Sequence, residues 1–228
     1  MIKGYIFDLD GTLLDSLNVW DNVGNRYLQS IGIQGPDDLD SLMEHMSLQE
    51  AALYMKNTFV LTQSVNEVAL GITYIIEEAY EKSIPLKIGA RKVIEKCFDK
   101  NYQIVAFTAG SVELATKALM RLNLFHYFQN IYSCQTCGYN KTEIESYLTL
   151  VKSMNLKVKE CVVVEDALYA IETAVNAGCY VKAIYDKYLD YPLSHKAIYD
   201  QANQKDWDKI CGIAHEHYES FIEMEDRI

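Results

Sequence analysis

The sequence predicts an α/β fold: a doubly wound parallel sheet with an all-helical cap inserted after its first strand. Three observations predict this fold class. Short, continuous apolar runs, typical of buried parallel strands, alternate with segments of helical periodicity. Residues 15–84 break the alternation, because they contain helical patterns but no strand-like run. Half of the 228 residues are hydrophobic (50%), which suffices for a sizeable core and excludes a disordered chain.

Strands and helices are expected to alternate in the predicted sheet domain. The apolar runs expected to form strands are 5–7, 103–108, 161–164 and 181–184. Helices are expected on apolar stripes formed by Val93, Ile94, Cys97 and Phe98, by Leu114, Ala118, Leu119 and Leu122, by Ile144, Leu148, Val151 and Met154, and by Ile171, Ala174 and Val175. Gly178 follows the last stripe, where a glycine commonly ends a helix. This order is typical of a doubly wound α/β domain.

The inserted segment is expected to form a separate helical cap. Apolar residues recur at helical spacing in three of its stretches, 17–31, 48–55 and 65–80. Pro85 and Gly89 mark the return to the alternating pattern. The predicted organisation is therefore an α/β core formed by residues 1–14 and 85–228, with the helical cap at 15–84.

The C-terminal part is expected to contain a polar connection, roughly residues 186–204, and then one amphipathic helix. The apolar stripe of that helix would consist of Trp207, Ile210, Cys211, Ala214, Tyr218, Phe221 and Ile222. No internal repeat or low-complexity segment occurs in the sequence.

The charge balance argues against two classes of partner. The chain carries 21 Lys and Arg against 32 Asp and Glu, a net charge of −11, and a pI near 4.9. Nucleic acid and anionic membrane surfaces are not expected as partners, because both are bound by clustered cations. The first ten residues include charges, and no apolar run reaches the roughly 18 residues of a membrane span. Neither a signal peptide nor a span is expected, and the expected location is the cytoplasm.

The six cysteines are expected to be reduced thiols rather than a disulfide framework. Cys134 and Cys137 form a CxxC pair. A structural zinc site usually needs a second pair of ligands, and none lies at a suitable spacing. A metal or redox role of this pair is therefore not expected.

An acidic motif, Asp8-Leu9-Asp10-Gly11-Thr12, follows the first predicted strand. In open parallel sheets, ligands bind beyond the carboxyl ends of the strands. Two carboxylates at positions i and i+2 leave that edge on the same side, and Gly11 and Thr12 allow a tight turn. Acidic turn residues also occur without a function, but a DxDGT sequence directly after an apolar strand favours a functional site.

Three further segments are expected to bring polar groups to the same edge. One strand ends in Thr108, and the helix after it offers free backbone N–H groups to an anion, although Ser111 also fits an ordinary N-cap. Lys141 precedes another helix, and Glu165-Asp166 ends the strand at 161–164. Taken alone, Lys141 fits a surface lysine and Asp166 an N-cap. Four such segments together predict one polar site.

This set of residues resembles the haloacid dehalogenase superfamily, over nearly the whole chain. The matching segments are FDLDGT at 7–12, the apolar run that ends at Thr108, Lys141, and VVVED with the following helix at 162–178. The resemblance implies a Rossmann-like core, and the segment 15–84 is similar to the family's helical cap. Within the superfamily, the chain looks most like the phosphoglycolate phosphatase and β-phosphoglucomutase group.

The resemblance implies a Mg²⁺-dependent phosphomonoester hydrolase that acts through an aspartyl phosphate. Asp8 would be the nucleophile. Asp10 would be the general acid for the leaving alkoxide and then the base for the attacking water. Thr108 and the amide of Ala109 would hold the transferring phosphoryl oxygens, and Lys141 would tie them to Asp8. The expected partner is a small phosphorylated metabolite, and the expected state is a monomer or a weak dimer.

The resemblance also implies a magnesium site. Asp166, the Asp8 carboxylate and the Asp10 backbone carbonyl would bind Mg²⁺, with Glu165 as a further ligand or as the partner of a ligand. These roles make physical sense, since Mg²⁺ takes oxygen ligands and keeps several waters. A carboxylate nucleophile can approach a phosphate dianion only when cations screen the repulsion.

Several alternatives use related residues. A phosphosugar mutase would use the same groups but return the phosphoryl group to the sugar. A phosphonate-cleaving enzyme would need a cap lysine for a Schiff base, and Lys56 is a candidate by location only. A dehalogenase is disfavoured by Asp10, and a signalling receiver domain by the DxD pair on the first strand. A non-catalytic phosphate-binding protein is disfavoured because every reacting group is present.

Overall fold

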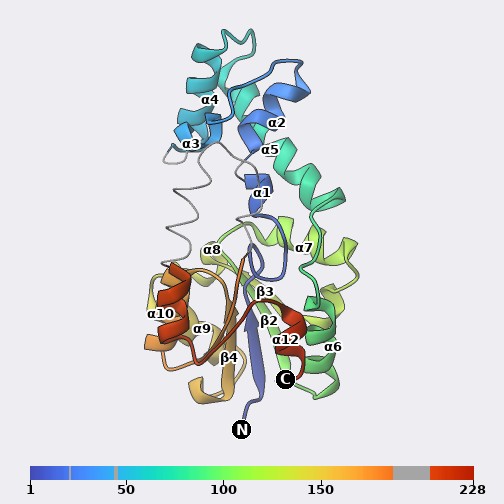
Figure 1. The fold of residues 1–228 in the computed structure, drawn as a ribbon, viewed down its shortest axis with the longest axis vertical. Coiled ribbons are helices and arrows are strands. Elements are labelled where there is room, and N and C mark those ends of the chain that lie inside the picture. Colours follow the sequence, from blue (N-terminus) through green and yellow to red (C-terminus); the bar gives the residue numbers. More distant parts are fainter. Residues whose placement is uncertain (21, 44–45, 187–205) are drawn as a thin grey trace.

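The structure, a computed structural model, describes residues 1–20, 22–43, 46–186 and 206–228 (Figure 1). A layered α/β part contains both termini, and a group of helices lies beyond the carboxyl end of its first strand (Figure 1). Most of the predicted polar connection, 186–204, falls outside the described residues. In the described part of the chain, no helix is long and apolar enough to cross a membrane.

Within the part of the chain that the structure describes, the sheet has six strands in the order β3-β2-β1-β4-β5-β6, and every neighbouring pair is parallel. The strands are β1 Gly4–Phe7, β2 Gln103–Thr108, β3 Asn130–Ser133, β4 Cys161–Glu165, β5 Tyr180–Ile184 and β6 Glu216–Tyr218. The predicted α/β class is confirmed, as are the four predicted strands, to within one residue at each end. β3 and β6 were not predicted as strands.

Helices cover both faces of the sheet because successive strand residues point to opposite faces. In β1, Tyr5 and Phe7 belong to one apolar cluster and Ile6 to the other. The first cluster is covered by α6 (Ala90–Asp99), α7 (Val112–Arg121) and α12 (Phe221–Glu225), and the second by α9 (Ile144–Ser153) and α10 (Leu168–Asn176). This arrangement is the doubly wound architecture (Figure 1).

The predicted helix ends and faces are mostly confirmed. The Ser111 side chain caps α7 by accepting the Glu113 N–H, and Gly178 adopts a left-handed conformation (φ 88°) after α10. The predicted stripe of α9 was partly wrong, because Ile144 and Leu148 are exposed. Tyr147, Leu150 and Val151 form the buried face instead, with Met154 just beyond the helix. Short helices complete this part of the fold: η1 Phe125–Tyr127, α8 Cys134–Cys137 and η2 Val158–Glu160.

The prediction of a single C-terminal amphipathic helix was wrong. A helix covers 206–213, but β6 then joins the sheet beside β5, and α12 follows. The sheet edge explains the interruption, since the N–H of His215 pairs with the Val181 carbonyl and β6 completes the ladder. Trp207 and Ile210 therefore pack in one cluster, while Phe221 packs in the other.

The described residues of the inserted segment form five helices: α1 Leu17–Trp20, α2 Val23–Ser30, α3 Leu39–Met43, α4 Leu48–Thr58 and α5 Val65–Lys82. Reciprocal capping boxes fix the starts of the two longest, with Ser47 and Glu50 at α4 and Ser64 and Glu67 at α5. Helices α2 to α5 bury an apolar cluster of their own, which includes Tyr27, Leu28, Leu39, Met55, Val68 and Ile72.

The last turn of α5 packs against the α/β part. Ala79, Tyr80 and Ile84 are buried in the same cluster as the sheet residues. Arg121 of α7 donates to the Tyr80 carbonyl at 3.0 Å and also to the Ile84 carbonyl, so the C-terminal end of α5 is held against α7. The two segments that connect the inserted helices to the α/β part also pair with each other. The Asp15 N–H donates to the Pro85 carbonyl at 3.0 Å. The division at 14/15 and 84/85 stays a prediction.

Candidate active site

A buried lysine bridges two carboxylates at the carboxyl edge of the sheet. Asp8 follows β1 directly, its N–H donates to the Val164 carbonyl at 3.0 Å, and the residue is only 5% exposed. Lys141, 4% exposed, donates to Asp8 Oδ1 and, at 2.5 Å, to Glu165 Oε1. Segments far apart in the sequence thus meet at one ionic cluster.

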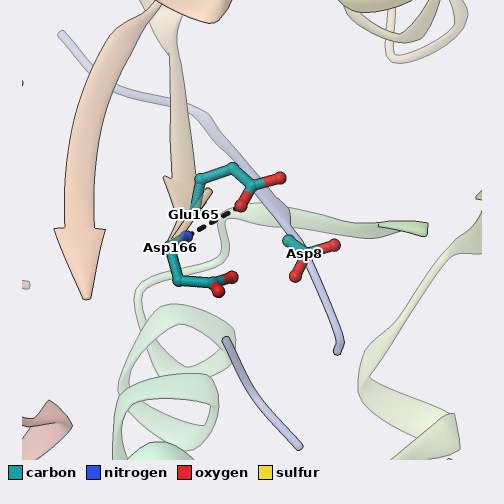
Figure 2. Close-up of side chains that lie close together, drawn as sticks. All are labelled: Asp8, Glu165 and Asp166. Atoms are coloured by element: carbon teal, nitrogen blue, oxygen red, sulfur yellow. Dashed lines mark hydrogen bonds between the residues drawn. The ribbon is translucent and has the colours of Figure 1, made fainter. Parts of the chain in front are cut away.

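The end of β4 orients the other carboxylates. Glu165 Oε2 accepts the Asp166 N–H at 2.7 Å (Figure 2) and also the Ala167 N–H at 3.0 Å. Thr12, in the turn after β1, donates to Asp166 Oδ1 at 2.6 Å. Both oxygens of Glu165 therefore already accept hydrogen bonds, whereas Asp166 is oriented through one oxygen.

Asp8, Glu165 and Asp166 form a possible metal-binding cluster (Figure 2). Each offers a carboxylate oxygen, and these three oxygens lie within 4.8 Å of one another. Asp8 Oδ2 is buried and has no hydrogen-bond partner among the described residues. Lys141 forms ion pairs with two of these three carboxylates, those of Asp8 and Glu165, and one cation does not balance three carboxylates, so the cluster carries excess negative charge. This donor set fits a hard divalent cation, which prefers oxygen ligands.

Burial sets the electrostatics of the cluster. It raises the pKa of Asp8 to about 7, and Glu165 adds to the effect while Lys141 opposes it. Burial and the carboxylates of Glu165 and Asp8 also raise the pKa of Asp166 well above its ordinary value. Burial acts to lower the pKa of Lys141, but Asp8 and Glu165 outweigh it and raise that pKa. Lys141 therefore remains a cation at neutral pH.

Stability without divalent metal is expected to fall as pH rises from about 4 to 7. The folded-state pKa of Asp8 is raised from 3.8 to about 7, so in this window the folded protein holds a proton that the unfolded chain has lost. The contribution is fully present below the unfolded pKa and disappears as pH rises through the folded pKa. Thermal unfolding in EDTA should show a falling Tm over this window.

Asp8→Asn is the matched comparison, since asparagine has nearly the same shape but does not titrate in this window. Its Tm should fall less steeply with pH than that of the wild type. The other titrating groups are common to both proteins, so they largely cancel in the difference. Parallel Tm curves for the two proteins would contradict the assignment to Asp8.

Gly11 lies where no side chain fits. Its φ is +87°, and a Cβ there would fall 2.4 Å from Asp166 Oδ2. Gly11→Ala should therefore displace the Asp166 carboxylate and raise the divalent-metal concentration needed for half-maximal activity, by roughly tenfold or more. Gly32→Ala is the matched control, because Gly32 has a φ of +79° but open space around it. An equal effect of the two substitutions on metal activation would contradict the steric account.

Asp10 has a different set of partners. Its Oδ1 accepts from Ser16 Oγ at 2.8 Å and from the Tyr80 hydroxyl, while its Oδ2 accepts from Thr108 Oγ1 at 3.2 Å. Thr108 Oγ1 also accepts the Gly110 N–H at 2.9 Å, at the start of the loop before α7. Burial and the Asp10 carboxylate raise the pKa of Tyr80, so its hydroxyl keeps the proton that it donates. Asp10 is thus held by three hydroxyl groups.

The structure brings the predicted residues together in two adjoining groups. One contains Asp8, Lys141, Glu165 and Asp166, and the other contains Asp10 and Thr108, with Ala109 exposed directly after Thr108.

The sequence analysis missed the contacts of Ser16 and Tyr80 with Asp10. Ser16 follows the acidic motif by a few residues, so its proximity to Asp10 could have been anticipated from the short loop. Tyr80 is 70 positions away from Asp10, and no sequence pattern near either residue predicts their contact.

Lys56 lies outside both groups. Its ammonium donates to the carbonyls of Leu61 at 2.9 Å and Gln63 at 2.5 Å, in the turn after α4. Lys56 thus closes a turn in the inserted segment, which weighs against the phosphonate-cleaving alternative.

Most of the chain is similar to known proteins. Residues 5–184 match the haloacid dehalogenase-like hydrolases. The chain belongs to the haloacid dehalogenase-like hydrolase family. Hexitol phosphatase A of Escherichia coli is 26% identical over 184 residues, which cover 80% of this chain and 82% of that protein. Glyceraldehyde 3-phosphate phosphatase of Pyrococcus abyssi is 25% identical over 201 residues, 82% of each chain.

The fold is also similar to solved structures of this haloacid dehalogenase-like group. A Thermotoga maritima protein of the β-phosphoglucomutase type superposes with a TM-score of 0.81 at 19% identity, over 100% of both chains. At this identity the likeness establishes the fold alone, and the phosphatase relatives support the activity.

Proposed function

We propose that this chain is a Mg²⁺-dependent phosphomonoester hydrolase that acts on a small phosphorylated metabolite through an aspartyl phosphate on Asp8. The observation that carries the proposal is the buried Asp8 carboxylate. Lys141 fixes Oδ1, while Oδ2 is buried without a hydrogen-bond partner within the described structure, and Asp8 belongs to the carboxylate cluster. A fixed carboxylate with one oxygen available is suited to attack phosphorus, which splits hydrolysis into two steps.

The proposed roles divide between the two groups of residues. Asp8 attacks the phosphoryl group, and Lys141 screens the negative charge between the nucleophile and the phosphate oxygens. Thr108 and the Ala109 amide bind the transferring oxygens at the loop before α7. Asp10 gives a proton to the leaving alkoxide and then removes one from the attacking water.

Asp8, Asp166 and the Asp10 backbone carbonyl are the proposed ligands of Mg²⁺. Mg²⁺, when bound, screens the repulsion between the nucleophile and the phosphate dianion. The proposed part of Glu165 is to orient Lys141 and the Asp166 backbone rather than to ligate, because both of its oxygens already accept hydrogen bonds.

A phosphorylated sugar or sugar alcohol is the proposed substrate class. Two relatives, named hexitol phosphatase A and glyceraldehyde 3-phosphate phosphatase, support this substrate class. Each is identical to this chain at about a quarter of the aligned residues. The cytoplasm is the proposed location, and the six free cysteines support a reducing compartment.

The test is a phosphate-release screen over hexitol phosphates, glyceraldehyde 3-phosphate, phosphoglycolate, nucleoside monophosphates and an aryl phosphate, with Mg²⁺ or with EDTA. Release should require Mg²⁺ and favour the sugar and sugar alcohol phosphates. Activity that persists in EDTA would contradict the metal-dependent reaction. Phosphorus NMR of a hexose 1-phosphate distinguishes the mutase, since isomerisation that outpaces phosphate release would replace the hydrolase proposal.

A further inference from the structure

Tyr80 contacts the Asp10 side chain of the candidate site, but the proposed reaction assigns it no role. It lies in the last turn of α5 and is 2% exposed, and its hydroxyl donates to Asp10 Oδ1. Trp20 Nε1 in turn donates to the Tyr80 hydroxyl at 3.1 Å, and the two rings meet edge to face with centroids 6.3 Å apart. The Tyr80 hydroxyl is therefore held between an indole donor and a carboxylate acceptor.

The backbone of Tyr80 is also fixed, and it is fixed to the α/β part. Its carbonyl accepts from Arg121 Nε at 3.0 Å, and Lys117 pairs with the neighbouring Glu81 at 2.9 Å. Both cations come from α7, the helix that follows the Thr108 loop. Tyr80 thus has a fixed position relative to that loop, which is the proposed binding place of the phosphoryl oxygens.

The two oxygens of Asp10 have different surroundings. Oδ1 accepts from Ser16 and Tyr80, which together fill the two acceptor positions of that oxygen. Oδ2 faces Thr108, and a Cβ placed on Gly110 would lie 3.6 Å from it. The oxygen that remains able to carry a transferable proton is therefore Oδ2, on the side of the Thr108 loop.

We propose that Tyr80 is a positioning residue: with Ser16 it holds Asp10 Oδ1, so that Oδ2 gives its proton to the leaving oxygen of the substrate. The inference rests on the proposed hydrolase function. It assigns a role in the chemistry to a residue of the inserted segment, at the point where that segment packs against α7. Without the Tyr80 hydroxyl, the Asp10 side chain can rotate away from the leaving group.

The test compares two esters that differ only in their leaving group, phenyl phosphate and 4-nitrophenyl phosphate, with Mg²⁺ present. The 4-nitrophenolate ion leaves readily without a proton, whereas phenolate depends on the general acid. The quantity to measure is kcat/KM, because it ends at the first irreversible step and excludes hydrolysis of the aspartyl phosphate. Tyr80→Phe should lower kcat/KM by roughly tenfold or more for phenyl phosphate, but by less than about threefold for 4-nitrophenyl phosphate.

Two further variants keep the result interpretable. Trp20→Phe removes the N–H that donates to the Tyr80 hydroxyl, at a partly exposed position. It should shift the ratio of the kcat/KM values for the two esters in the same direction as Tyr80→Phe, by a smaller factor. Tyr27→Phe, at a buried tyrosine inside the inserted segment, should leave the ratio unchanged. These variants separate the hydroxyl of Tyr80 from a general loss of packing.

The outcomes distinguish failure of the positioning role of Tyr80 from failure of the hydrolase function. An equal loss on both esters in Tyr80→Phe, or no loss on either, overturns the positioning role while the hydrolase function stands. A wild-type protein that releases no phosphate from these esters or from the sugar and sugar alcohol phosphates of the screen overturns the hydrolase function and the positioning role together. A selective loss on phenyl phosphate, in Tyr80→Phe and not in Tyr27→Phe, supports the role.

Discussion

Asp8→Asn is expected to abolish turnover, lowering kcat by roughly 10⁴-fold or more. The amide keeps the shape of the carboxylate and can still accept from Lys141, but it is a far weaker nucleophile toward phosphorus. The variant should remain folded, because the substitution removes a charge whose burial raises its pKa and therefore opposes folding at neutral pH. Steady-state phosphate release at saturating Mg²⁺ measures the effect.

Asp40→Asn is the matched control for Asp8→Asn. Asp40 is a partly buried carboxylate in α3 that accepts the Gly24 N–H at 2.8 Å, inside the inserted segment. Its replacement should leave kcat within about threefold of the wild type. Substantial turnover by Asp8→Asn, with the fold intact, would rule out Asp8 as the nucleophile.

Lys141→Met should damage both stability and activity. Methionine replaces the only cation that the structure pairs with Asp8 and Glu165, as far as the described residues show, and leaves two buried carboxylates facing each other. Removal of one partner from a buried ion pair typically costs about 3–5 kcal/mol. Without the opposing effect of Lys141, the pKa of Asp8 would rise from about 7 to a higher value, so the nucleophile would be protonated at neutral pH. We expect kcat/KM to fall by roughly 10²–10³-fold or more.

Lys182→Met separates these two effects. Lys182 is a buried lysine in β5 that pairs with Glu216 at 3.4 Å and donates to the Arg227 carbonyl, away from the carboxylate cluster. This variant should lose stability while its folded fraction retains normal kcat/KM. Chemical denaturation together with kinetics below the unfolding transition measures both properties. A Lys141→Met enzyme with near-normal kcat/KM would contradict the electrostatic role of Lys141.

The sequence predicted those parts of the fold that depend on local pattern. β2 has the predicted bounds because four apolar residues, 104–107, form a continuous run between the polar residues Gln103 and Thr108. β6 was missed because only three residues pair with β5, and these residues, Glu-His-Tyr at 216–218, do not form an apolar run. The stripe of α9 was misassigned because periodicity alone does not reveal which of two neighbouring apolar faces meets the sheet.

The candidate site could be assembled from sequence for a similar reason. Parallel strands place their carboxyl ends at one edge, so the Asp8–Asp10 motif, Thr108 and Glu165–Asp166 had to lie near one another once the strands were identified. Tyr80 could not be found in this way, because its contact with Asp10 depends on where α5 ends and how that end packs against α7. The position of Glu165 likewise required the hydrogen bonds of its two oxygens.

The central claim, that Asp8 becomes phosphorylated, is tested most directly with Asp10→Asn and 4-nitrophenyl phosphate. Loss of the Asp10 base should slow hydrolysis of the aspartyl phosphate, while the good leaving group still allows its formation. Stopped-flow mixing should show a burst of about one equivalent of 4-nitrophenolate per active site. Acid-quenched protein should carry phosphate on the peptide that contains Asp8. Turnover without a burst, with no phosphate on Asp8, would contradict the account.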